Sequence, residues 1–253
     1  MIIATPNAGG FPGDGMQQAE SLEFQKFLSV FNADAQHRCL CTGLRKPLRF
    51  VPQETLPADM AYEAFIAQTG GIPTRDNLHD RYNALVWLAA PLTKALLNRL
   101  QHQEIIRLGG VTRRGSVRDA LTIWDENLLV LVADQSTDQS ADLLKELLER
   151  RNWSGLFLEH RSKWHRQWHA RLFGHALMEK LRKPFKAITA HVVIIQSYET
   201  SWPVLDQALV DWLSAQKELS PRLLRPLPVM GIPGWCSENE QADFYNDTSV
   251  FRK

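Results

Sequence analysis

The residues of this chain best suited to chemistry lie on one long predicted helix, from about Leu78 to Leu100. At about 100° per residue, one side of this helix is an ordinary apolar stripe. The opposite side also collects apolar residues, unlike a solvated face, and places polar side chains among them. Buried polar groups need partners, and a pocket or a bound ligand is one way to supply them. This second side consists of His79, Asn83, Val86, Trp87, Ala90 and Lys94, with Asp80 at its edge.

A structural explanation of the same side is also open. His79 and Asp80 would then stabilise the start of the helix, and Asn83 would bond to a neighbouring loop. In either case we expect Pro91 to kink or divide the helix, because proline removes a backbone donor and clashes with the preceding turn.

A second group of charged residues surrounds a predicted hairpin. The β-prone runs 117–124 and 128–133 are separated by three polar residues that are typical of a tight turn. The charged side chains either join the helix in a shared site or serve only the turn and a local ion pair. They are Arg118, Asp119, Asp125 and Glu126.

Histidines gather in one part of the chain, with five of eight between positions 160 and 191. If that region were helical, His165 and His169 would be neighbours at i, i+4, as would His175 and Glu179, and such pairs can bind zinc. This spacing alone is more often incidental, so the metal content stays unknown. His175 follows Gly174 and is better placed for a buried role.

These residues favour an enzyme of hydrolytic type, with a metal ion as an optional aid. A histidine would act as general acid or base, an aspartate would orient it or hold a cation, and a lysine or arginine would stabilise an anion. No nucleotide-binding glycine loop, zinc-protease motif or G-x-S-x-G nucleophile motif is present, and the S-x-x-K match at 214–217 is better explained by chance. The catalytic candidates are His79, Asp80, Asn83, Arg118, Asp119 and His175, and the candidates for ligand binding are Lys94, Trp87, Asp125, Glu126 and Trp235.

Two other function classes remain open. In a structural or adaptor protein, the polar motifs would serve only caps, turns and buried hydrogen bonds. In a nucleic-acid or anion-binding module, the segment 150–186 would supply ten basic against two acidic residues, a net charge of +8, interleaved with aromatic rings. The alternative explanation of that segment is a solvated face that pairs with the acidic helix before it.

The sequence pattern predicts helices and strands that are mixed without regular βαβ alternation, which indicates an α+β fold. We expect a flexible arm over residues 1–17 and one globular domain over 18–253. Helices are predicted at 24–31, 61–68, 78–100, 136–151, 173–182 and 203–219, and strands at 48–51, 117–124, 128–133, 155–158 and 188–195. Beyond Ser220, four prolines and many apolar residues predict an extended segment wrapped over the body.

Composition sets the outer limits. The chain has 253 residues, 44% of them hydrophobic, and a formal net charge of +1, which excludes a disordered polyelectrolyte and a disulfide-stapled miniprotein. Its three cysteines form no paired framework, and no signal peptide or membrane-length apolar run is evident. We therefore expect a cytoplasmic protein without membrane association. The oligomeric state, the cofactors and any small-molecule partner are unknown.

Several segments in a fixed order resemble a bacterial family known as domain of unknown function 3025. They are HDRYNALVW and PLTK (79–94), RDALTIWDE (118–126), FGHALMEK (173–180), TAH (189–191), and LPVMGIPGW with FYND and FR (227–252). The resemblance spans about residue 60 to the end and implies no established activity, substrate or cofactor. It implies that His79, Asp80, Asn83, Lys94, Arg118, Asp119, Asp125, Glu126, His175 and Trp235 belong to the pattern, whereas His165 and His169 do not.

Overall fold

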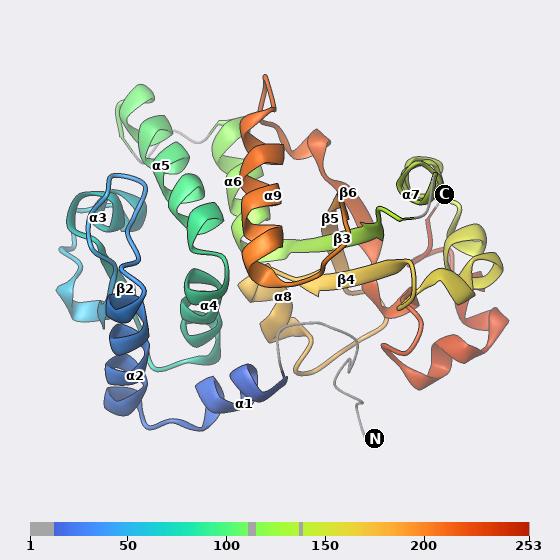
Figure 1. Ribbon diagram of the computed structural model, residues 1–253, viewed down its shortest axis with the longest axis horizontal. Coiled ribbons are helices and arrows are strands. Elements are labelled where there is room, and N and C mark those ends of the chain that lie inside the picture. The colour runs from blue at the N-terminus through green and yellow to red at the C-terminus, as the bar shows by residue number, and fades with distance from the viewer. Residues whose placement is uncertain (1–12, 111–114, 137–138, 253) are drawn as a thin grey trace. The chain divides into compact units, whose positions relative to one another are not determined.

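The computed structural model describes residues 13–110, 115–136 and 139–252 and confirms the predicted α+β class (Figure 1). The chain forms two compact units. Among the described residues, the helical unit contains 14–110, 115–126 and Trp202–Pro221, and the sheet unit contains Gly13, 127–136, 139–201 and 222–252. Within the described ranges, none of the helices combines the length and the apolar character that a membrane crossing requires. The arm predicted at 1–17 lies outside the described residues up to position 12, and the rest of it begins a helix.

The helical unit surrounds a small parallel sheet, in which Phe50 is paired with Ile72. Phe27 and Phe31, one helical turn apart, pack with ring centroids 4.1 Å apart, and Phe50 meets Phe31 edge-on. This aromatic core explains the predicted helix face that begins at Phe24. The elements are α1 (Gly13–Ser21), α2 (Phe24–His37), β1 (Arg49–Pro52), α3 (Tyr62–Thr69), β2 (Gly71–Thr74), α4 (Leu78–Ala89), α5 (Pro91–Arg107), α6 (Ser116–Asn127) and α9 (Trp202–Ser214).

The long predicted helix is divided at proline, as expected. Ala90 leaves the helical conformation with φ −131° and ψ 61°, and Pro91 occupies the first position of α5. Proline is well tolerated there because a first-turn residue has no intrahelical hydrogen bond to donate. The next two backbone N–H groups, of Leu92 and Thr93, donate to the Asp206 carboxylate of α9 at 2.9 and 2.7 Å.

The predicted hairpin is wrong. Residues 117–124 are not a strand but most of α6, and 125–127 end that helix instead of forming a turn. The reason lies in packing: Ala120, Leu121 and Trp124 form one buried helical face, and Trp124 packs on Trp212 of α9 with ring centroids 5.5 Å apart. This tertiary contact outweighs the β propensity of the valine, isoleucine and threonine in the segment.

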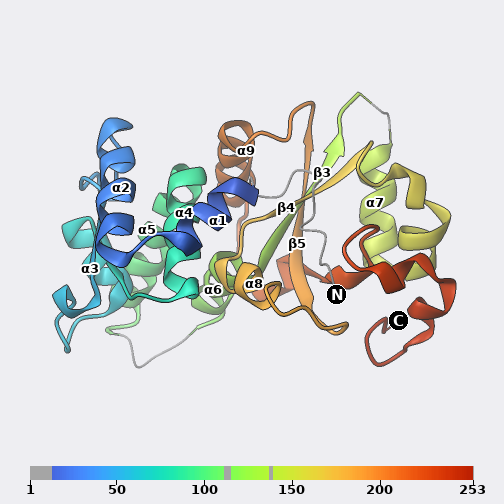
Figure 2. The ribbon, with the colours of Figure 1, turned by 90° about the horizontal axis from the view of Figure 1, so that it is seen from below.

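The sheet unit is built on one mixed sheet, whose strand order is β4-β3-β5-β6. The central strand β3 (Leu128–Asp134) runs parallel to β5 (Thr189–Ser197) and antiparallel to β4 (Trp168–Leu172), while β6 (Arg225–Pro228) pairs antiparallel with β5. The amphipathic helix α7 (Ser140–Glu149) packs against the sheet, as Figure 2 shows. The strands predicted at 128–133 and 188–195 are thereby confirmed.

Another predicted strand, 155–158, is wrong. The segment forms a wide helical turn, Gly155–Glu159, with Leu156 and Phe157 fully buried. The Asn152 side chain accepts a hydrogen bond from the Gly155 N–H at 2.9 Å and starts the turn. A buried apolar run of four residues does not distinguish a strand from a helical turn.

The C-terminal segment combines β6 with short 3₁₀ turns at Val229–Gly231, Ser237–Glu240 and Ala242–Asn246. Its apolar side chains are buried in the sheet unit, where Tyr245 and Phe251 pack around Phe157. Their burial agrees with the expectation that this segment is not a free tail.

Candidate functional site

Lys94 is the centre of a buried polar cluster in the helical unit. Its side chain is 4% exposed and forms an ion pair with Asp125 at the end of α6. The ammonium group also donates to Asn83 Oδ1 of α4 at 2.8 Å and lies 5.3 Å from the centre of the Trp87 ring. Four of the predicted site residues, from three helices, are therefore in one place. The division of the helix at Pro91 lets α4 and α5 supply residues to the same point.

Asn83 extends the cluster to Tyr62, which opens α3. The Asn83 amide donates to the Tyr62 hydroxyl at 3.0 Å. Burial raises the pKa of Tyr62 well above its ordinary value of 10.0, and the negative charges of Glu63, Asp80 and Asp125 add to this shift. The phenol therefore stays protonated at physiological pH and is available as a hydrogen-bond donor.

The neighbouring residue, Glu63, has a pKa that lies close to neutral pH. Asn98 Nδ2 donates to its carboxylate at 2.6 Å and to its backbone oxygen at 2.9 Å. Burial, helped by the negative charge of Asp125, raises the pKa of Glu63 from 4.5 to about 7, against the opposing influence of Asn98, Lys94 and Arg118. A carboxyl group with this pKa can both take and give a proton near neutral pH.

These groups enclose a very small cavity of about 10 Å³. That is about the space that one water molecule needs. Asn98 Oδ1 is buried and has no hydrogen-bond partner among the described residues, so it remains available as an acceptor. The cavity is lined by Tyr62, Glu63, Ile66, Trp87, Lys94, Leu97, Asn98, Gln101 and Asp125. We call Tyr62, Glu63, Asn83, Lys94, Asn98 and Asp125 the Lys94 cluster.

Three members of the Lys94 cluster are absent from the sequence-based candidates: Tyr62, Glu63 and Asn98. The sequence contains one signal for Asn98, which follows Lys94 by one turn of α5 and therefore lies on the same side of that helix. Asn83 and Trp87 have the same spacing on α4. Tyr62 and Glu63 begin a separate helix after Ala61, and nothing in their local pattern indicates that their polar ends meet residues of α4 and α5.

Asp80 has a structural role in the loop before α4. Its carboxylate accepts hydrogen bonds from the Arg75 backbone N–H at 2.7 Å and from two nitrogens of the Arg75 guanidinium at 3.0 Å. Its own N–H is capped by the Asn77 side chain at 2.8 Å. The structural explanation of this residue as a stabiliser of the helix start is thus supported. His79 beside it is half-buried and does not line the cavity.

The charged residues of α6 are divided between the cluster and the surface. Asp125 joins the cluster, and the positive charge of half-buried Arg118 opposes the rise that burial causes in the pKa of Glu63. Asp119 and Glu126 are exposed. The helical turn, rather than a hairpin, decides which of them point inward.

His175 and Trp235 are buried in the sheet unit, where His175 begins the short helix α8 (His175–Lys180). His79 and Asp119 belong to the helical unit. The shared site of His79, Asp119 and His175 therefore stays a prediction.

The histidine pair proposed for metal binding does not lie on a helix. His169 is on β4, and His165 lies in the turn before it, where its Nε2 is 2.8 Å from the Pro233 carbonyl oxygen. Burial lowers the pKa of His169. No group of three or more histidine, cysteine or acidic side chains in the described ranges is arranged to hold a metal ion.

The aromatic residues of the basic segment 150–186 belong mainly to the core. Only Phe185, at 56% exposure, lies on the surface, among the described rings of that segment. Stacking platforms for bases must be accessible, so the segment offers charge but little stacking surface. The buried rings are Trp153, Phe157, Trp164, Trp168 and Phe173.

Comparison with known proteins gives a family but no function. A family model described as "Protein of unknown function (DUF3025)" matches residues 48–253. No curated protein and no solved structure matches the chain.

Proposed function

The chain belongs to the DUF3025 family, whose description assigns no activity, and we propose from the geometry of the Lys94 cluster that it is an enzyme of hydrolytic type. The observation that carries this proposal is the placement of Glu63, Tyr62 and Lys94 around a cavity the size of one water molecule. A carboxyl group with a pKa of about 7, a protonated phenol and a fixed ammonium are the parts that acid–base hydrolysis needs.

In this proposal Glu63 replaces His79 and His175 as the acid–base group. Ionised Glu63 takes a proton from a water molecule, whose oxygen forms a bond to the electrophilic atom of the substrate, the carbonyl carbon of a carboxylic ester or the phosphorus of a phosphoric ester. Lys94 and the Tyr62 hydroxyl stabilise the negative charge that develops on the substrate oxygen. The bond to the leaving group then breaks, and Glu63 returns its proton to that group.

The remaining members of the Lys94 cluster position these three. Asp125 and Asn83 hold the Lys94 ammonium, and Asn98 fixes the Glu63 carboxylate. The cavity must open to admit a substrate. Ile66 of α3 and Leu97 of α5 both line the cavity, so opening requires α3 to separate locally from α5. Lid motions of this kind are common in enzymes that exclude water during chemistry.

A panel of chromogenic carboxylic and phosphoric esters tests the proposal. We expect the wild type to hydrolyse at least one of them, with a rate that rises with pH around the pKa of about 7. Glu63→Gln should lose about a hundredfold in rate, since a general base contributes at least that much. Glu54→Gln, which changes an exposed carboxylate of the same unit, is the matched control and should leave the rate unchanged. Equal rates for wild type and Glu63→Gln over the whole panel would contradict the proposal.

A structural role is the second candidate, favoured by the closure of the cavity. The cluster ties α3, α4, α5 and α6 together through charged and amide groups. In that case Glu63→Gln would change the stability of the chain and its pH dependence, but no ester in the panel would be hydrolysed.

A further inference from the structure

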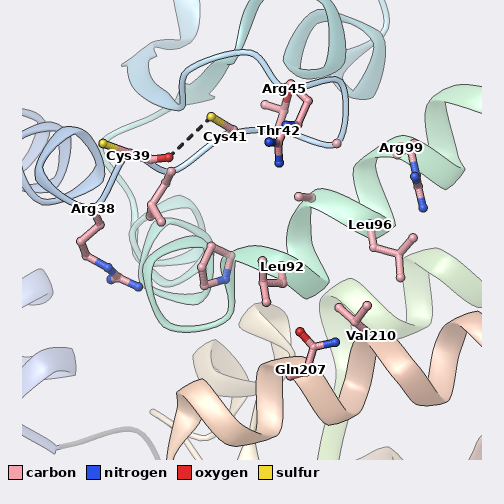
Figure 3. Close-up of a pocket in the computed structure, with 14 residues that line it drawn as sticks. Arg38, Cys39, Cys41, Thr42, Arg45, Leu92, Leu96, Arg99, Gln207 and Val210 are labelled. Atoms are coloured by element: carbon pink, nitrogen blue, oxygen red, sulfur yellow. Dashed lines mark hydrogen bonds between the residues drawn. The ribbon is translucent and has the colours of Figure 1, made fainter.

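A groove in the helical unit combines an apolar floor with a basic rim (Figure 3). Its volume is about 730 Å³. One wall is the segment 38–45 that follows α2, the floor is the start of α5, and the other wall is α9. Sites for small organic molecules usually have volumes of roughly 300–1,000 Å³, so this groove is of the right size for one.

The wall formed by 38–45 is held firmly on α5. A side chain at Gly43 would place its Cβ 2.4 Å from the Ala95 carbonyl oxygen and 2.5 Å from Arg99 Cβ, so only glycine permits this approach. The turn is closed by a hydrogen bond from the Thr42 N–H to the Lys46 carbonyl at 2.9 Å. The groove therefore has a fixed width instead of one set by a loose loop.

The floor of the groove is aliphatic. Leu92, at the start of α5, is 50% exposed, which is high for a leucine in a folded chain. Leu96 on the same helix and Val210 on α9 lie beside it, as Figure 3 shows. Leu96 is itself buried and Val210 is half-buried, so an aliphatic ligand body would mainly remove the Leu92 side chain from water, and that burial is favourable.

The rim is basic. Arg38, Arg45 and Arg99 line the groove, and no acidic residue does so among those that the structure describes. Arg38 is held by Asp34 at 3.3 Å and by the Leu88 carbonyl at 2.8 Å. Arg45 and Arg99 form no ion pair with any residue in the part of the chain that the structure describes.

Two acidic residues of α9, buried Asp206 and exposed Asp211, already accept hydrogen bonds from neighbouring groups. Asp206 accepts from the first turn of α5, and Asp211 accepts from the Gln207 amide at 2.9 Å. Burial raises the pKa of Asp206, against the opposing influence of the hydrogen bonds from Thr93 and Leu92 and of the Arg38 charge. Two guanidinium groups thus remain to meet a negative charge that enters from solvent.

We propose that this groove binds a small amphipathic anion, with an aliphatic body on Leu92, Leu96 and Val210 and a carboxylate or phosphate head between Arg45 and Arg99. Guanidinium groups bind both kinds of head through paired hydrogen bonds. A described lining without acids selects against cationic amphiphiles of the same shape. This proposal is independent of the hydrolytic function proposed above.

Calorimetric titration of the full chain tests the ligand class. The probes are decanoate and decyl phosphate, each below its critical micelle concentration, with decyltrimethylammonium and inorganic phosphate as controls for charge and for the aliphatic body. We expect binding of at least one of the two amphipathic anions, and the preferred head group identifies its chemistry. Binding of neither anion, or equal binding of the ammonium compound, would overturn the proposal.

Variants locate the site. Arg45→Gln with Arg99→Gln should weaken binding of the anion about tenfold, which corresponds to the loss of a charge-assisted contact. Arg222→Gln removes an equivalent exposed charge from the sheet unit and should leave the affinity unchanged. These substitutions lie on the surface, and circular dichroism will show whether the fold is intact. An unchanged affinity in the double variant would place the ligand elsewhere and refute the assignment.

Discussion

At the scale of single residues, Glu63 and Lys94 show how burial and charge act together. Burial contributes most to the raised pKa of Glu63, and Asp125 and Lys94 then act on it with opposite signs. Lys94 is itself almost fully covered and depends on Asp125 and Asn83 to compensate for lost hydration. Removing a partner of Glu63 or of Lys94 is therefore expected to change the free energy of unfolding of the chain.

The pH dependence of stability tests the Glu63 environment. The folded chain holds the Glu63 proton more tightly than the unfolded chain, so this stabilisation is fully present below pH 4.5 and is lost as the pH rises through about 7. Its size is up to about 3 kcal/mol. In urea unfolding measured over this range, wild type should lose stability more steeply than Glu63→Gln. Parallel pH profiles would show that the carboxyl is not perturbed.

The Lys94–Asp125 ion pair gives a second test at this scale. Lys94→Met removes the buried ammonium from the Asp125 carboxylate, which is 14% exposed, and should lower the free energy of unfolding by about 3 kcal/mol. Lys94→Met with Asp125→Leu should recover most of that loss, because both charged members of the buried pair are then replaced by apolar side chains. Arg107→Met, from a pair whose arginine is 62% exposed, is the control and should cost less than about 1 kcal/mol. A double variant as unstable as the single one would argue against the ion pair as the cause.

At the scale of elements, a segment follows its local sequence where its own stereochemistry determines the structure, and departs from it where a distant contact does. Pro91 carries its own stereochemical reason for a break, and the break is found. The segment 117–124 depends instead on Trp212 of α9, which lies far along the chain, so its local β propensity was misleading. The same limit applies to the site: Asn83, Trp87 and Lys94 share a predicted side of one helix, whereas Tyr62 and Glu63 join them only through tertiary packing.

The start of α5 offers a test of one such tertiary contact. Asp206 accepts from the Leu92 and Thr93 N–H groups, as an N-cap side chain would, although it belongs to another helix. Asp206→Ala should lower the free energy of unfolding by about 1–2 kcal/mol. Asp211→Ala, an exposed change further along α9, should have an effect within about 0.5 kcal/mol. Equal effects of the two variants in thermal unfolding would mean that the cap contributes little.

At the scale of the whole molecule, the two units are interleaved in sequence. The helical unit is completed only by α9, which the chain forms after β5 and before β6 of the sheet unit. A fragment ending at Glu126 therefore lacks both the Asp206 cap of α5 and the Trp212 contact of α6.

This connectivity predicts the behaviour of fragments. Residues 14–126 alone should lack a cooperative thermal transition, whereas a single polypeptide that joins 14–126 to 202–221 by a flexible linker should regain one. Circular dichroism during heating compares the two. A cooperative transition of the shorter fragment would show that α9 is dispensable for the helical unit.

The family match begins at residue 48. In the sequence this position follows the 38–45 wall of the groove and precedes α9, which forms the other wall. The start of α5 and the whole of α9 lie inside the matched range, whereas Arg38, Gly43 and Arg45 lie before it. For protein engineering, a substitution at Arg45 changes one of the two head-group arginines without altering any residue of the Lys94 cluster, as long as Gly43, which packs closely on Ala95 and Arg99, is kept.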